Sequence, residues 1–398
     1  MDGKGRIRRI VWILVVLLWA VSGPLNGRAD AEVRARAIFV GDVMAHKQQL
    51  EAAERRLEDG EKVWDFKPQF RRVKPLFERA LVVANLETVF AGSERGYAGY
   101  PSFNTPDSLT EALNDLGVGV VTLANNHILD RGASGARRTT EVLDGAGIAW
   151  TGLGLDDIPA NSPLILEHQG LRWAFVSYSY GSNRVLASSD VHLNVISEAA
   201  VASGLKRAEM ASPDLVVACF HWGVEYQHTP SQHQKRAAET ALKHGADLVI
   251  GTHPHVLQPV EVRDAESGRA RPVVWSLGNF VSFQRTLPRE RSGVLAVDVV
   301  KHPGMVRARV ERLSIAPTRV SVLGSGKSRR IEVVYAGRGG PFNHEGLPSG
   351  ELRIARNAGD AVLGFLGAAA EPDERGFYTL WSAQEPGALP KPVRKAPR

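Results

Sequence analysis

The chain has 398 residues, of which 43% are hydrophobic and 23% charged, so it can bury a large core. This composition excludes disorder over most of its length. The formal net charge is +6, but residues 1–31 hold five basic and two acidic residues, which leaves 44 basic against 41 acidic residues in the remainder. Such a balance excludes the charge pattern of a nucleic-acid-binding protein, and the single cysteine, Cys219, excludes an internal disulfide.

The first 31 residues have the features of a secretory signal peptide. Four basic residues between positions 4 and 9 precede an apolar run from Ile10 to Val21, and Ala29 and Ala31 are small residues at the spacing that a signal peptidase recognises. The run is shorter than the roughly 20 apolar residues of a spanning helix. The segment predicts export to the periplasmic or extracellular face of the membrane, with cleavage or retention as an uncleaved anchor as alternatives.

From residue 36 onward, short runs rich in Val, Ile and Leu alternate with longer segments of helical character. This order is typical of a mainly parallel sheet covered by helices. The runs are apolar on both faces, as buried strands are. Six of them are predicted as strands, over residues 37–42, 81–87, 119–124, 214–220, 247–251 and 273–277.

The remaining segments contain clear boundary signals. Thr105-Pro106 predicts a helix that ends at Gly117, and Ser231 predicts another that ends at Gly245. Residues 164–167 and 171–179 are predicted to form a hairpin, and residues 294–300 and 306–315 two antiparallel strands. Beyond Pro317 the chain is glycine-rich without a clear helical period, so the main domain is predicted over 35–316, with 317–398 as a C-terminal extension of unknown role.

Polar residues follow the strongest predicted strands. Because ligands of open α/β sheets lie beyond the carboxyl ends of the strands, these side chains are expected to converge. Carboxylates, an amide carbonyl and imidazoles can together hold one or two divalent ions, such as Mn, Zn, Fe or Mg, with positions left open for water. The sequence therefore predicts a metal centre for metal-assisted hydrolysis, with the ligands Asp42, Glu87, Asn126, His221, His253 and His255.

Several of these residues have a second interpretation. Asp42, which follows a glycine, could cap the next helix, although its place at a strand end among other candidate ligands favours metal binding. His127 is a candidate acid for the leaving group, or it holds the loop of Asp130. Glu225 is a substrate contact, a support for the ligands or an exposed acid.

Four further histidines and three polar residues complete the candidates. Asn125, Asp130 and Asn279 are predicted to contact substrate or to support the metal ligands. The histidines of helical or loop segments are predicted to be solvated; they are His46, His228, His233 and His244.

With these residues in view, the chain resembles the capsule-synthesis protein CapA family, also called the poly-gamma-glutamate biosynthesis CapA family. The resemblance covers roughly residues 35–316 and implies a role in synthesis, attachment or remodelling of a capsular or cell-surface polymer such as poly-γ-glutamate. It rests on six ordered motifs: GDVM at 41–44, NLET at 85–88, ANNHILDRG at 124–132, HWGVEY at 221–226, GTHPHVLQPVE at 251–261 and SLGNF at 276–280.

That family is similar to the calcineurin-like metallophosphoesterases. The resemblance therefore implies an αββα sandwich of mixed sheets with a dinuclear metal site at the carboxyl ends of the strands. Two positions depart from the phosphoesterase pattern: Met44 stands where a histidine is usual, and Glu87 where an aspartate is usual. Loss of the histidine removes a nitrogen ligand from one metal position, so occupancy by a single ion is an alternative and phosphatase activity does not follow.

Two classes of function are compatible with these features. The first is an exported metal-dependent hydrolase or transferase that acts on an anionic cell-surface polymer or its precursor. The alternative is a non-catalytic assembly subunit of a membrane synthase complex for the polymer. Met44 favours the assembly subunit, whereas His127 beside Asn126 favours the enzyme.

Overall fold

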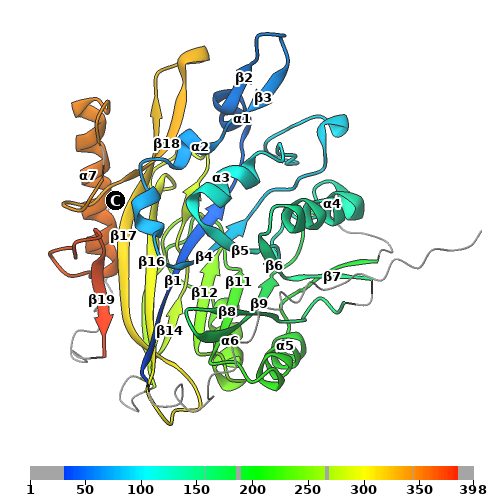
Figure 1. Ribbon diagram of the computed structural model, residues 1–398, viewed down its shortest axis with the longest axis vertical. Coiled ribbons are helices and arrows are strands. Elements are labelled where there is room, and N and C mark those ends of the chain that lie inside the picture. Colours follow the sequence, from blue (N-terminus) through cyan, green and yellow to red (C-terminus); the bar gives the residue numbers. More distant parts are fainter. Residues whose placement is uncertain (1–30, 157, 185–189, 265–268, 343, 384–398) are drawn as a thin grey trace, which may run out of the picture.

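A computed structural model describes residues 31–383 apart from 157, 185–189, 265–268 and 343. The segment predicted as a secretory signal, up to residue 30, lies outside the described residues. Two mixed β-sheets share one core, and helices cover their outer sides (Figure 1). Within the described ranges, no helix is both long enough and apolar enough to cross a membrane.

The larger sheet has nine strands: Val33–Val43 (β1), Leu81–Leu86 (β4), Val118–Thr122 (β5), Ala149–Thr151 (β6), Asn279–Val281 (β15), Arg291–Lys301 (β16), Arg309–Leu323 (β17), Arg330–Tyr335 (β18) and Tyr378–Ser382 (β19). Their order is β18-β17-β16-β1-β4-β5-β6, with β15 paired to β1 and β19 to β17. Strands β1, β4, β5 and β6 run parallel, whereas β16 to β19 pair in antiparallel fashion.

The smaller sheet has six strands: Leu164–His168 (β8), Leu171–Ser179 (β9), Leu215–His221 (β11), Leu248–Thr252 (β12), Val260–Arg263 (β13) and Arg271–Val274 (β14). Their order is β13-β14-β12-β11-β9-β8. The four central strands are parallel and both edge strands are antiparallel. The α/β class with mixed sheets and the hairpin of β8 and β9 are confirmed.

Short elements complete the chain. Two small sheets pair Glu54–Arg56 (β2) with Lys62–Trp64 (β3), and Leu153–Leu155 (β7) with Val191–Leu193 (β10). The α-helices are Lys47–Ala53 (α1), Lys67–Phe70 (α2), Leu109–Leu116 (α3), Gly132–Gly145 (α4), Glu198–Met210 (α5), Gln232–Lys243 (α6) and Ser349–Leu366 (α7). The described residues also include single turns of 3-10 helix at Lys74–Phe77 (η1), Ser93–Arg95 (η2) and Gly326–Ser328 (η4).

Strand β11 shows why the central strands are apolar on both faces. Val217 and Cys219 face the core between the two sheets, whereas Val216, Ala218 and Phe220 face the helices α5 and α6. Successive side chains of a strand point to opposite faces, so a strand between two buried layers needs apolar residues at every position. The continuous apolar runs of the sequence therefore mark the inner strands correctly.

Two predicted boundaries differ from the structure. The helix predicted from Thr105 begins only at Leu109, because the Thr105 N–H donates to Val89 and its hydroxyl bonds Thr88, which holds this segment as a loop. The strand predicted to end at Leu277 ends at Val274. Ser231 does cap α6, where its hydroxyl accepts the N–H of Gln234.

The region after Pro317 continues the larger sheet. Pro317 lies within β17 opposite Gly293, and β18 and β19 both pair with that strand. The domain boundary predicted after residue 316 thus falls inside a strand. The expectation that this region lacks a helical period is wrong, because α7 buries Ala355, Ala358 and Val362 against it.

Candidate metal centre

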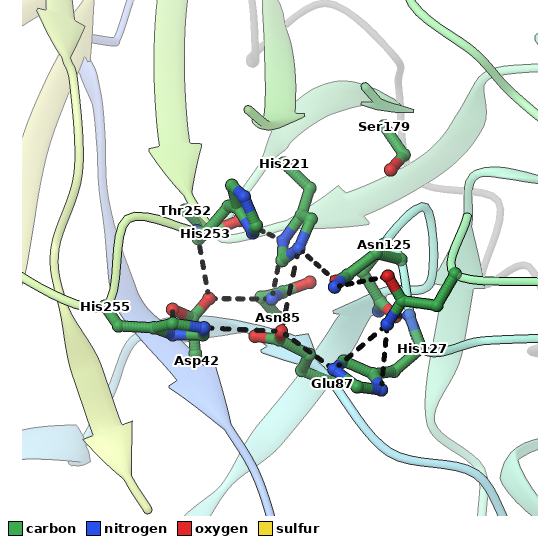
Figure 2. A network of polar contacts seen from close by, with 12 residues as sticks. Asp42, Asn85, Glu87, Asn125, His127, Ser179, His221, Thr252, His253 and His255 are labelled. Carbon is green, nitrogen blue, oxygen red and sulfur yellow. Dashed lines mark hydrogen bonds and ion pairs between the residues drawn. The ribbon is translucent and has the colours of Figure 1, made fainter. Parts of the chain in front are cut away.

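The polar residues predicted at strand ends gather at one edge where the two sheets meet (Figure 2). Asp42 lies near the end of β1, and Glu87 directly follows β4 of the same sheet. His221 ends β11 of the other sheet, and His253 and His255 follow β12. Parallel strands bring their carboxyl ends to a common edge, so the topology places residues from both sheets around one centre.

Glu87 occupies the middle of this centre and is fully buried. Neither of its carboxylate oxygens has a hydrogen-bond partner among the described residues. Oε1 instead faces imidazole nitrogens, at 3.7 Å from His221 Nε2, 3.9 Å from His255 Nε2 and 4.0 Å from His127 Nε2. Burial, assisted by the nearby Asp42, raises the pKa of Glu87 well above its ordinary value.

Asp42 holds its neighbours by hydrogen bonds. Its Oδ1 accepts from Asn85 Nδ2 at 2.8 Å and from the backbone N–H of His253 at 3.3 Å. Its Oδ2 lies 3.0 Å from Nδ1 of His255, and Asn279 Oδ1 lies 3.0 Å from the same nitrogen. Two oxygens at Nδ1 keep the proton there, so Nε2 of His255 remains a lone-pair donor toward the centre.

His221 and His253 are neutral imidazoles. Burial lowers the pKa of His253 to about 4 and that of His221 well below its ordinary value. Their rings lie 4.6 Å apart, and Nδ1 of His253 has no hydrogen-bond partner within the described structure. The neutral ring is the form that binds a metal, so both side chains are prepared as ligands.

The backbone of the His253-Pro254-His255 segment directs both rings toward the centre. Both histidines have left-handed conformations, with φ angles of 96° and 58°. Such angles are uncommon for residues other than glycine and cluster at functional sites. The fold maintains them here through the bond from the His253 N–H to Asp42 and through Asn279 at His255.

The donor set fits a divalent ion. Three groups each place one carboxylate oxygen or imidazole nitrogen per residue within 4.8 Å of one another: Glu87, His221 and His253; Asp42, Glu87 and His255; and Glu225, His253 and His255. Mixed oxygen and nitrogen donors of this kind suit zinc, manganese or iron. The orphaned carboxylate of Glu87 provides an independent reason, since a buried charge needs a compensating one.

His127 lies at the edge of the centre. Its Nδ1 is 2.9 Å from Asp130 Oδ2, and Asp130 also accepts the N–H of Phe103 at 2.7 Å. The carboxylate fixes the Nδ1–H tautomer and leaves Nε2 directed toward Glu87. The geometry therefore accommodates both interpretations of His127, the acid and the residue that holds the Asp130 loop.

The other predicted residues take different places. Asn125 Nδ2 donates to the carbonyl of Leu86, and its Oδ1 accepts the N–H of His127. Asn125 therefore fixes the loop rather than facing the centre. Asn126, which was predicted as a ligand, has its Oδ1 2.7 Å from His221 Nε2, so its carbonyl oxygen contacts another candidate ligand. Glu225 is exposed and lies next to His253 and His255.

Several residues of the site had no role predicted from the sequence. Asn85, two residues before Glu87, lies between Asp42 and His221, and Thr252 contacts His221 Nδ1 at 3.2 Å. Their signal was their position at the ends of the same strands. The ring of Tyr180 lies 4.5 Å from that of His253.

His46 is not solvated as predicted. It is half-buried, its ring lies 5.4 Å from that of Phe103, and its Nδ1 accepts the N–H of Phe283. Burial lowers the pKa of His46 to about 4. Met44 is buried in the core beside the centre, with an exposed fraction of 2%.

Two mixed sheets that share one core, with carboxylates and imidazoles at their strand ends, define an α/β protein with a candidate metal centre. The chain belongs to the bacterial capsule synthesis protein PGA_cap family, whose pattern matches residues 36–284. The capsule biosynthesis protein CapA of Bacillus anthracis is 28% identical over 294 residues, which cover 68% of this chain and 67% of that protein. The PGA biosynthesis protein CapA of Bacillus subtilis is 27% identical over 295 residues, which cover 70% of this chain and 71% of that protein.

More distant similarities extend this list. A probable polyglutamine synthesis accessory protein of Mycobacterium tuberculosis is 28% identical over 190 residues, 44% of this chain and 48% of that protein. Among solved structures, the calcineurin-like phosphoesterase YfkN of Bacillus subtilis is 15% identical and covers 72% of this chain and 91% of its own, with a TM-score of 0.44. The NAD nucleotidase of Haemophilus influenzae is 14% identical, and the match covers 82% of this chain and 62% of that chain, with a TM-score of 0.45.

Proposed function

We propose that this protein is an exported, metal-dependent hydrolase or transferase that acts on an anionic capsular or cell-surface polymer of the poly-γ-glutamate kind. Metal binding is supported above all by the surroundings of Glu87. This buried carboxylate faces three imidazoles and has no hydrogen-bond donor among the described residues. Membership of the capsule synthesis family supports a polymer of this kind as the substrate. The basic and apolar character of residues 1–31 supports export.

The residues divide the chemistry among them. Asp42, Glu87, His221, His253 and His255 would hold the ion, which when bound supplies Lewis-acid polarisation of a carbonyl or phosphoryl oxygen. His127, whose Nδ1 is held by Asp130, would give a proton to a leaving group from Nε2 when its ring is doubly protonated; in this structure Nε2 lies 3.4 Å from Asn183 Nδ2. Asn126 at the same edge orients the His221 ring.

The direct test is metal analysis of the purified protein. We expect the native protein to hold a divalent ion, His253→Ala to lose most of it, and His233→Ala on the exposed face of α6 to retain it. Hydrolysis of phosphoesters and of poly-γ-glutamate is then measured for the same three proteins. A native protein without any divalent metal would contradict the proposal.

Met44 favours a second candidate function, a non-catalytic assembly subunit of a polymer synthase complex. Met44, two residues after Asp42, is a buried thioether at a sequence position where phosphoesterases usually have a histidine, so one nitrogen ligand of a second metal position is missing. In that case the native protein binds metal without turnover, and His253→Ala still supports polymer formation in cells.

A further inference from the structure

We propose that Arg289 is the anion-recognition residue of this centre, and that its guanidinium binds a carboxylate or phosphate group of the substrate. This inference deepens the proposed function and rests on it. Arg289 is half-buried, and its Cζ lies 3.3 Å from the centroid of the Tyr226 ring. That ring in turn lies 6.0 Å from the ring of His255, so the guanidinium lies beside the metal-ligand cluster.

The guanidinium is available to a ligand. Among the described residues, no carboxylate lies within ion-pair distance of Arg289 and no acceptor bonds its side chain, so the guanidinium contacts the Tyr226 ring alone. Other arginines of the chain are engaged: Arg138, for example, binds both carboxylate oxygens of Asp107. A planar fork stacked on an aromatic ring keeps its N–H groups free for bidentate binding of a carboxylate or phosphate.

The backbone, rather than an ion pair, holds Arg289 in place. Its carbonyl accepts from Asn279 Nδ2 at 3.0 Å, and its N–H donates to the carbonyl of Thr286 at 2.9 Å. Asn279 is the residue whose Oδ1 faces Nδ1 of His255. The position of the cation is thus tied to the position of a candidate metal ligand, which is the preorganisation that recognition requires.

The next residue anchors the same loop on its other side. Glu290 is buried, its carboxylate lies 3.7 Å from Arg291 Nε and 3.8 Å from Arg319 Nε, and its carbonyl accepts the N–H of Val320 at 2.9 Å. Val320 belongs to β17, beyond the part of the chain that matches the family. The loop of Arg289 is therefore held in place by β17.

The charges of the centre explain why a cation is needed beside it. Asp42, Glu87 and Asp130 are buried acids, and Glu225 is an exposed acid beside His253 and His255. A divalent ion would balance the buried acids when bound, but the exposed Glu225 still repels an approaching anionic polymer, and a positive group nearby offsets that repulsion. Arg289 supplies that group next to the aromatic face of Tyr226.

The test compares Arg289→Gln and Arg289→Lys with Arg353→Gln, which removes the same charge from the exposed side of α7. Binding of poly-γ-glutamate of defined length and of inorganic phosphate is measured by calorimetry, and metal content is measured on every sample. We expect Arg289→Gln to weaken binding by about tenfold or more with unchanged metal content. Arg289→Lys, which keeps the charge without the fork, should fall between, and Arg353→Gln should match the native protein.

The two probes separate the two sources of the anion. A loss confined to the polymer assigns Arg289 to a carboxylate, and a loss confined to phosphate assigns it to a phosphoester; either result supports the inference. Native-like binding of both probes by Arg289→Gln overturns it, as does failure of the native protein to bind either probe. Loss of metal in Arg289→Gln also overturns it, because the residue would then act on the structure of the centre.

A measurement in chelator distinguishes this inference from the proposed function. If the native protein holds no metal, the proposed function fails. The inference is then judged alone by whether metal-free native protein binds the polymer more tightly than metal-free Arg289→Gln.

Discussion

Two buried carboxylates in the larger sheet have opposite surroundings. Glu332 of β18, with an exposed fraction of 2%, pairs with the buried Arg72, and Arg330 Nε lies 3.3 Å from its other oxygen. Glu87, with an exposed fraction of 0%, faces imidazoles and a second carboxylate instead. An interior acid that serves only the fold is accompanied by its own cation, whereas Glu87 is arranged to receive one from outside the chain.

The largest expected effect comes from breaking the structural pair. Arg72→Met leaves Glu332 buried without its main partner, so we expect the free energy of unfolding to fall by about 3–5 kcal/mol. Urea denaturation measures the change. The double variant Arg72→Met, Glu332→Leu should recover most of it, and a single variant within about 1 kcal/mol of native would show that the pair is not needed.

The corresponding change at the other carboxylate should have the opposite sign for stability. Burial and the nearby Asp42 oppose ionisation of Glu87, and Glu87→Gln removes this ionisable group, so in chelator we expect the variant to be more stable than the native protein by about 1 kcal/mol. Its affinity for a divalent ion should fall by about 100-fold or more. A competing chelating dye measures the affinity, and a loss of stability in chelator would count against a site built for a cation.

The stability of the region around the candidate metal centre should also depend on pH, through the half-buried His46. Because burial lowers its pKa from 6.5 to about 4, the unfolded chain takes up a proton before the folded one does as pH falls. The stability contributed by the neutral ring is complete above pH 6.5 and is lost as pH falls toward about 4, on the order of 2 kcal/mol.

Chelated native protein should therefore lose more stability between pH 7 and pH 4 than His46→Gln does. Urea unfolding at both values measures this, with the exposed His233→Gln as the control. Equal losses in native protein and His46→Gln would mean that the His46 ring is not kept neutral by the fold.

The smallest expected effect sets the scale for the others. Ser231→Ala removes the hydroxyl that caps α6 and should lower the free energy of unfolding by about 1 kcal/mol, as measured by thermal denaturation. Metal affinity should not change, because α6 lies on the outer face of the smaller sheet. A change in affinity would show that the outer helices influence the centre.

The sequence predicted the inner strands well because their signal is local. A strand such as β11, buried on both faces, needs a continuous apolar run, and its polar end residue His221 marks the edge of the sheet. Asp42, Glu87 and the three later histidines could be collected in this way from strand ends alone. Their arrangement around Glu87 could not, because it depends on the pairing of strands far apart in the chain.

The C-terminal region shows the opposite case. β18 and β19 pair with β17 over long sequence distances, and α7 buries mainly alanines, whose apolar signal is weak. Arg289 and Tyr226 are brought together by a loop between strands, so neither residue type nor spacing indicated their contact. His46 was misjudged because a histidine before a helix looks solvated unless Phe103 and Phe283 are known to lie against it.

The division of the candidate ligands between two sheets has a mechanical consequence. Asp42 and Glu87 are attached to the larger sheet and His221, His253 and His255 to the smaller one, with the bond from the His253 N–H to Asp42 crossing the seam. An ion held by both groups of ligands would link the two sheets. Any movement of one sheet relative to the other would then change the coordination of the ion. The rigidity of the contact between the two sheets therefore determines how well the positions of the candidate ligands are preserved.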